Sequence, residues 1–141
     1  MTIVSVLAIV LLVFLGLVHV YWALGGSVWI DKAIPRIDGQ ATITPGMVIT
    51  LLVAIALFSF AGVIYLLQFN NLTTWVYGEY IVYLGWVLAG VFMLRAIGDF
   101  KVVGFFKKVT DSAFAKYDTF YYSPLCLAFS VVFAILAYRQ M

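Results

Sequence analysis

The sequence predicts an all-α integral membrane protein: a four-helix bundle with an amphipathic interfacial segment between the third and fourth helices. Hydrophobic residues make up 66% of the 141 residues, and charged residues only 10%. A soluble domain of this size needs far more charge to cover its surface. The length fits one domain, residues 1–141. The apolar residues also gather into four runs, at about residues 3–24, 45–67, 76–97 and 121–138.

These runs are expected to be transmembrane helices. A span needs roughly 20 predominantly apolar residues, which the first three runs supply and the fourth only approaches. Within lipid every backbone polar group must be satisfied inside the segment, so helices are favoured over single strands. The first run lacks a basic region before it and is longer than the apolar core of a signal peptide. We therefore expect it to be retained.

Local motifs predict the helix boundaries. Thr44-Pro45 and Ser123-Pro124 are typical of helix starts, because a hydroxyl can cap the first turn and proline fits the first helical position. Gly25-Gly26 is typical of a helix end. Asn70 to Thr73 form a short turn between the second and third helices.

The distribution of basic residues predicts the orientation. Seven of the eight lie in or beside two connections on one side of the membrane: Lys32, Arg36, Arg95, Lys101, Lys107, Lys108 and Lys116. The opposite side has only Arg139. Because basic residues near spans stay in the cytoplasm, we expect both long connections to be cytoplasmic and both termini to lie outside.

The connection at about residues 99–120 has amphipathic spacing. Apolar residues recur every three or four positions, at Val102, Phe106, Val109, Ala113, Tyr117 and Phe120. This pattern suits two short helical pieces in the headgroup layer, the second beginning at Thr110-Asp111-Ser112. Its lysines are candidate headgroup-binding residues: Lys101, Lys107, Lys108 and Lys116. The segment either anchors the bundle or forms one wall of a lipid-headgroup site.

Polar residues in the cytoplasmic halves of the spans are candidate site residues. His19, Trp22 and Gly26 share one face of the first helix. An ionisable residue inside a span suggests a functional site, although the favoured interpretation of His19 is a neutral histidine bonded to a tyrosine or a backbone carbonyl. Arg95 and Asp99 have the spacing of a helical ion pair, and Arg95 could alternatively hold a phosphate or carboxylate.

Other polar residues predict little chemistry. Glu79 lies near the outer end of the third helix, where a solvated acid is common. Cys126 is the only cysteine, so no disulfide is expected. One histidine and one cysteine far apart do not form a metal set, and neither a metal nor another cofactor is expected.

Several motifs resemble a bacterial family of small four-helix membrane proteins defined only as a domain of unknown function. They are His19–Gly26, Leu94–Phe100, Val103–Lys107, Asp118-Thr119 and Tyr122–Cys126. The resemblance covers essentially the whole chain and implies a bacterial membrane protein of four spans, with no activity to transfer. It also directs attention to a polar set: His19, Trp22, Arg95, Asp99, Asp118 and Ser123.

Three functions remain open from the sequence. The favoured one is a non-catalytic, multi-pass protein of the bacterial cytoplasmic membrane that binds lipid headgroups or serves as an accessory subunit. The expected partners are membrane lipids, with anionic headgroups, a partner subunit or a second copy as possibilities, and no nucleic acid. The alternatives are an enzyme acting on an amphipathic lipid by isomerase-like acid–base chemistry, using His19 with Asp99 or Asp118, and a small oligomeric transporter.

Overall fold

A computed structural model describes all residues 1–141 and confirms the all-α architecture. The first three long helices are α1 (Thr2–Ala23), α3 (Met47–Phe69) and α4 (Gly78–Ile97). The fourth is continuous but has three parts, α5 (Ala113–Tyr117), the π-helical turn η2 (Asp118–Tyr122) and α6 (Ser123–Tyr138). All four are long and apolar enough to cross a membrane.

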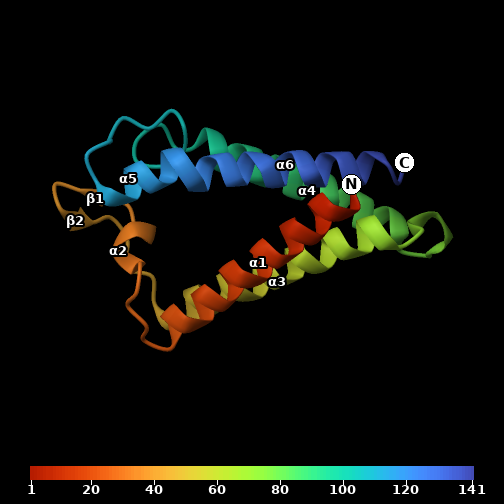
Figure 1. The fold of residues 1–141 in the computed structure, drawn as a ribbon, viewed down its shortest axis with the longest axis horizontal. Coiled ribbons are helices and arrows are strands. Elements are labelled where there is room, and N and C mark those ends of the chain that lie inside the picture. Colours follow the sequence, from red (N-terminus) through yellow and green to blue (C-terminus); the bar gives the residue numbers. More distant parts are fainter.

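The long helices form two pairs arranged as a V (Figure 1). Helix α1 packs along α3, and α4 packs along α6, whereas contacts between the pairs are far fewer. The pairs meet near the two termini and diverge toward α2 (Ile30–Ala33) and α5. We call this second end, formed by residues 24–46 and 98–122, the splayed end.

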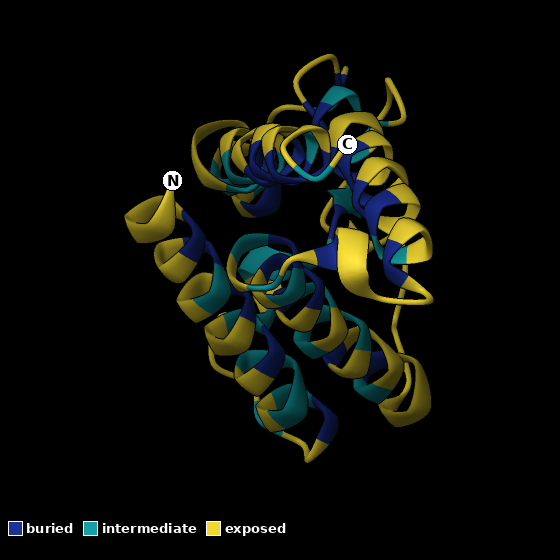
Figure 2. Ribbon diagram, turned by 90° about the vertical axis from the view of Figure 1, so that its right-hand side faces the viewer, coloured by how far each residue is buried: buried dark blue, intermediate teal, exposed yellow.

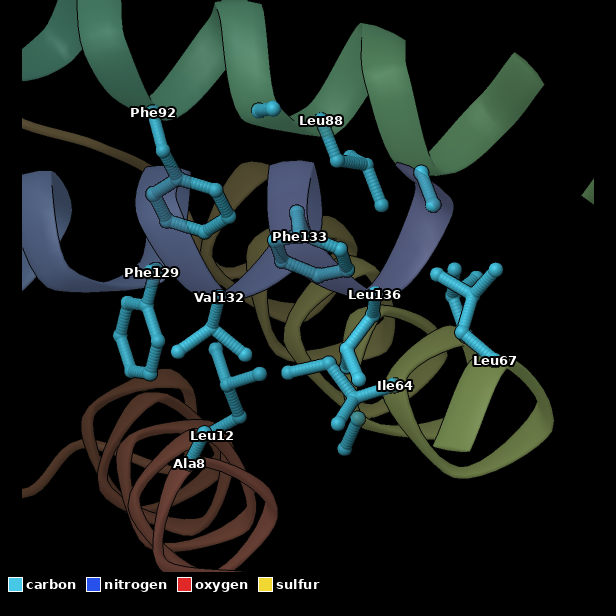
Figure 3. Close-up of a cluster of buried hydrophobic side chains, with 14 of the residues drawn as sticks. Ala8, Leu12, Ile64, Leu67, Leu88, Phe92, Phe129, Val132, Phe133 and Leu136 are labelled. Carbon is cyan, nitrogen blue, oxygen red and sulfur yellow. The ribbon is translucent and has the colours of Figure 1, made fainter. Parts of the chain in front are cut away.

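The shared core lies near the closed end of the V. Figure 3 shows Phe92 of α4 beside Phe129 and Phe133 of α6, with Leu12 of α1 and Ile64 of α3 packed below them. Phe133, Leu12 and Ile64 have no exposed surface. The outward faces of the helices are largely exposed and apolar, as expected for helices surrounded by lipid (Figure 2).

Short elements complete the connections. A two-stranded antiparallel hairpin, β1 (Arg36–Ile37) and β2 (Gln40–Ala41), follows α2. Its turn residues Asp38 and Gly39 both have positive φ, 50° and 78°, which is the requirement of a type I′ turn. A 3₁₀ turn, η1 (Leu72–Thr74), joins α3 to α4, and the Asn71 side chain caps it.

Some predicted boundaries are confirmed and others are wrong. Helix α1 ends at Ala23, and Gly25 follows with φ of 98°, as the Gly25-Gly26 motif predicts. Helix α3 begins at Met47 after Gly46, not at Thr44-Pro45. The fourth helix begins at Ala113, where the Ser112 hydroxyl accepts a hydrogen bond from the Ala115 N–H at 3.1 Å.

Ser123-Pro124 therefore lies inside the fourth helix and does not open it. Pro124 has no N–H to donate, and its ring crowds the carbonyl one turn earlier. The preceding turn widens into the π-helix η2, in which the Ser123 N–H donates to the Asp118 carbonyl. The wider turn keeps the helix continuous and changes the direction in which the side chains around Asp118 project.

The prediction of two short helices across residues 99–120 is correct only for the second. Residues 98–112 form a folded loop without helix. The physical reason is backbone geometry, because Gly98 and Gly104 have φ of 90° and 88°, which no helix contains.

Candidate functional site

Asp118 is the centre of a buried polar cluster at the splayed end. Its side chain has no exposed surface. One carboxylate oxygen, Oδ1, accepts a bond from Arg95 Nη2 at 3.0 Å, and the other, Oδ2, accepts one from Lys107 Nζ at 3.1 Å. The carboxylate thus joins α4, the 98–112 loop and the fourth helix.

Two further donors complete the coordination of Asp118. The Gly104 N–H donates to Oδ2 at 2.7 Å, and the Ser123 hydroxyl donates to Oδ1 at 3.2 Å. Each oxygen therefore accepts two hydrogen bonds, which is what a charge removed from water requires. Ser123 reaches Asp118 because both belong to the widened turn η2 and its boundary.

Lys107 differs from the headgroup-binding role expected for it. Its side chain is 1% exposed, and its ammonium also donates to the Gly104 carbonyl at 2.9 Å and the Thr119 hydroxyl at 2.5 Å. A lysine can be buried as a cation only with such partners. The charge of Asp118 therefore holds this side chain inside the protein, while Lys101, Lys108 and Lys116 remain exposed.

The 98–112 loop is folded back onto the end of α4. The Phe105 N–H donates to the Ala96 carbonyl at 2.9 Å, so the loop satisfies a carbonyl that the helix end leaves free. A Cβ on Gly98 would collide with the Val103 carbonyl, and one on Gly104 would collide with the Ile97 carbonyl. These two glycines make the close crossing possible.

Asp99 does not pair with Arg95, contrary to the prediction from their spacing. One Asp99 carboxylate oxygen instead accepts the backbone N–H groups of Lys101, Val102 and Val103 at 2.9, 2.8 and 2.9 Å. Slight burial acts to raise the pKa of Asp99, but these donors outweigh it and the pKa is lowered. Asp99 thus organises the loop, while the Arg95 side chain turns to the stronger partner, the buried Asp118.

His19 and Trp22 lie in the other helix pair and bond within it. His19 Nδ1 lies 2.7 Å from the Leu15 carbonyl of its own helix, and the ring meets Trp22 edge to face with centroids 5.0 Å apart. Trp22 Nε1 donates to the Val28 carbonyl at 2.8 Å and so secures the turn after α1. The structure therefore brings together Arg95, Asp118 and Ser123 of the predicted set, but not His19, Trp22 or Asp99.

A contact that sequence analysis missed connects the two helix pairs at the splayed end. The Tyr122 hydroxyl donates to the Lys32 carbonyl at 3.2 Å, and the Lys32 ammonium lies 5.2 Å from the centre of the Tyr117 ring. Helix α2 thereby packs against α5 across the opening of the V. The only sequence signals were an aromatic pair and a cation in different connections, which no spacing rule relates.

One known protein family matches most of this chain. The family described as "Protein of unknown function (DUF3995)" matches residues 12–133. The chain belongs to this DUF3995 family. The matched residues include the whole Asp118 cluster and His19, and the membership confirms the resemblance to a family of unknown function. The chain matches no curated protein and no solved structure.

Proposed function

We propose that this DUF3995 protein is a non-catalytic protein of the bacterial cytoplasmic membrane that binds anionic lipid headgroups at its splayed end. The observation that carries the proposal is a surface on which cations and aromatic rings are exposed together. Lys101, Lys108 and Lys116 are exposed there. Exposed aromatic side chains from the same segment accompany them: Phe100, Phe105, Phe106, Phe120 and Tyr121.

This combination suits the boundary between acyl chains and headgroups. Aromatic rings partition into that layer, and each lysine near an anionic surface contributes about 1 kcal/mol of attraction. Phe106 and Phe120 are 63% and 73% exposed, which is unfavourable in water but expected at a lipid interface. The basic side would face the cytoplasm by the distribution of cations, with both termini outside.

The Asp118 cluster supports this function by holding the surface rigid. Its hydrogen bonds tie Gly104 and Lys107 of the loop to α4 and to the fourth helix. The exposed lysines and phenylalanines are thereby presented by a fixed loop, and little conformational entropy is lost when they meet a headgroup.

The enzyme alternative requires Asp118 or His19 to exchange protons with a substrate. Asp118 already accepts four hydrogen bonds, and His19 Nδ1 is engaged with the Leu15 carbonyl. No observation favours this alternative or the transporter. An accessory-subunit role remains compatible with the same surface.

Neutralising the exposed lysines should lower the preference for anionic lipid. In vesicles of phosphatidylcholine, spin-labelled phosphatidylglycerol should associate with the wild-type chain more strongly than spin-labelled phosphatidylcholine. The Lys101→Gln, Lys108→Gln, Lys116→Gln triple variant should lose most of that preference, since each lysine contributes about 1 kcal/mol. Electron paramagnetic resonance measures the bound fraction directly.

The matched control is Arg139→Gln, which removes one exposed cation at the opposite end of the molecule. If it lowers the preference as much as the triple variant does, the attraction reflects total charge and not the proposed surface. If the triple variant keeps the full preference, the headgroup-binding function is wrong.

A further inference from the structure

The buried cluster carries one positive charge more than its carboxylate can neutralise. Arg95 and Lys107 each form an ion pair with Asp118, and the structure contains no other ion pair. Two cations against one anion leave a net charge of about +1 in a region shielded from water, which is costly unless an anion is near.

One nitrogen atom of the cluster has no hydrogen-bond partner. Arg95 donates to Asp118 through Nη2, but Nη1 is buried and has no hydrogen-bond partner. Every other buried side-chain nitrogen or oxygen atom of the chain has a hydrogen-bond partner. Since native proteins pair nearly all such groups, Nη1 is the atom of the cluster best suited to take a further acceptor.

Arg95 is placed where a lipid can reach it. It lies in the last turn of α4, and its side chain is 34% exposed, although Nη1 itself is covered. It lies between the buried Phe92 and the exposed Val91 around the helix. An exposed apolar stripe at helical spacing leads along α4 to the arginine: Leu84, Val87, Val91 and Leu94.

We propose that Arg95 is the binding site for the phosphate of a single anionic phospholipid, with acyl chains that lie along the exposed stripe of α4. This inference rests on the proposed headgroup function and adds one defined, saturable site to a diffuse attraction. The guanidinium turns so that Nη1, which is covered in this conformation, meets a phosphate oxygen, and the phosphate supplies the charge that Asp118 alone does not provide. The planar guanidinium suits it, because arginine can bond an anion through one edge while its other edge pairs with a carboxylate.

A spectroscopic titration of the wild-type chain tests the site without any substitution. The chain has three arginines, so ¹⁵N-labelled guanidinium groups give a small set of resonances in which Arg36 and Arg139 serve as internal references. In zwitterionic detergent micelles, short-chain phosphatidylglycerol should shift the Arg95 resonances until one lipid is bound per chain. Phosphatidylcholine should act about tenfold more weakly, since its ammonium group opposes the cluster.

Inorganic phosphate is the third ligand of the titration. If it shifts Arg95 at the same concentrations as phosphatidylglycerol, the site belongs to a soluble anion and the lipid assignment is wrong. If phosphatidylglycerol leaves the Arg95 resonances unmoved, or if phosphatidylcholine acts equally well, the proposal is overturned.

Arg95→Lys supplies a second test. Lysine keeps a cation for Asp118 but removes the planar group that carries Nη1. Native mass spectrometry should show the single phosphatidylglycerol adduct weakened about tenfold or more, as expected for a lost charge-assisted hydrogen bond. Arg139→Lys, the same exchange at an exposed arginine outside the proposed surface, should leave that adduct intact.

The two proposals fail separately. Loss of lipid preference in the lysine triple variant with an unresponsive Arg95 would keep the headgroup function and reject the single site. If Arg95→Lys does not fold, the titration of the wild-type chain still decides.

Discussion

Replacing Asp118 with Asn should lower the free energy of unfolding by about 3–5 kcal/mol, the range for removing one partner from a buried ion pair. Asn keeps the shape of the side chain but leaves the buried Lys107 and the partly exposed Arg95 without a counter-charge. An amide also cannot accept the four hydrogen bonds that the carboxylate accepts. Reversible unfolding in detergent micelles, followed by circular dichroism, measures the change.

The matched control for this prediction is Asp111→Asn, which neutralises an exposed acid of the same connection. It should change the stability by no more than about 0.5 kcal/mol. Adding Lys107→Met to Asp118→Asn should recover part of the loss, because it removes one of the two uncompensated cations. Equal stabilities of Asp118→Asn and Asp111→Asn would show that the cluster does not hold the splayed end together.

The second large effect is expected at Gly98. Its φ and ψ of 90° and −172° belong to a region that only glycine adopts readily, so Ala costs about 1–3 kcal/mol in backbone strain alone. The new Cβ would also collide with the Val103 carbonyl, which is part of the backbone and cannot rotate away. Gly98→Ala should therefore unfold the 98–112 loop or shift it off α4, and increased proteolysis within this loop measures that opening.

Gly90→Ala is the matched substitution on the same helix. A Cβ at Gly90 meets no atom within 4 Å, and the residue lies inside α4. Ala should be neutral there or stabilise the helix by up to about 1 kcal/mol. If the two variants are proteolysed at the same rate, the loop does not depend on the close crossing at Gly98.

The four spans could be predicted because lipid imposes simple rules on composition and length. Apolar runs of about 20 residues must be helices, whatever their neighbours. The end of α1 at Ala23 could also be predicted locally, since a glycine with positive φ, here Gly25, ends a helix without tertiary help. A helical piece after Ser112 was predicted, but its continuity with the fourth helix was missed because Asp118, Thr119 and Ser123 interrupt the apolar run.

The partner of Arg95 could not be found from helical spacing. Spacing relates residues on one helix, and it offered Asp99, whereas the structure pairs Arg95 with Asp118 from a distant segment. Which acid is the better partner depends on burial, and Asp99 is exposed while Asp118 is not. The burial of Lys107 could not be predicted for the same reason. In the sequence it resembles any other lysine of an amphipathic segment, and only the folded loop brings it to Asp118.

The amphipathic pattern of residues 99–112 was misleading for a different reason. Its spacing of three and four fits a helix, but Gly98 and Gly104 adopt positive φ and divert the chain into a loop. None of the apolar side chains of the pattern is buried in this loop, because Val102 and Val109 are half-buried and Phe106 is exposed. Lys107 of the expected polar face, in contrast, is buried. The periodicity was therefore wrong about both the backbone conformation and the buried face.

The claim on which the proposed function depends most is that the splayed end faces the cytoplasmic leaflet. Single cysteines introduced as Lys108→Cys and Gln140→Cys, in a chain that also carries Cys126→Ser, report the two ends. In intact bacterial cells, a membrane-impermeant maleimide should label the cysteine at position 140 at once and the cysteine at position 108 only after the membrane is opened. Labelling of position 108 from outside intact cells, with position 140 protected, would contradict the orientation and with it the proposed binding of cytoplasmic anionic lipids.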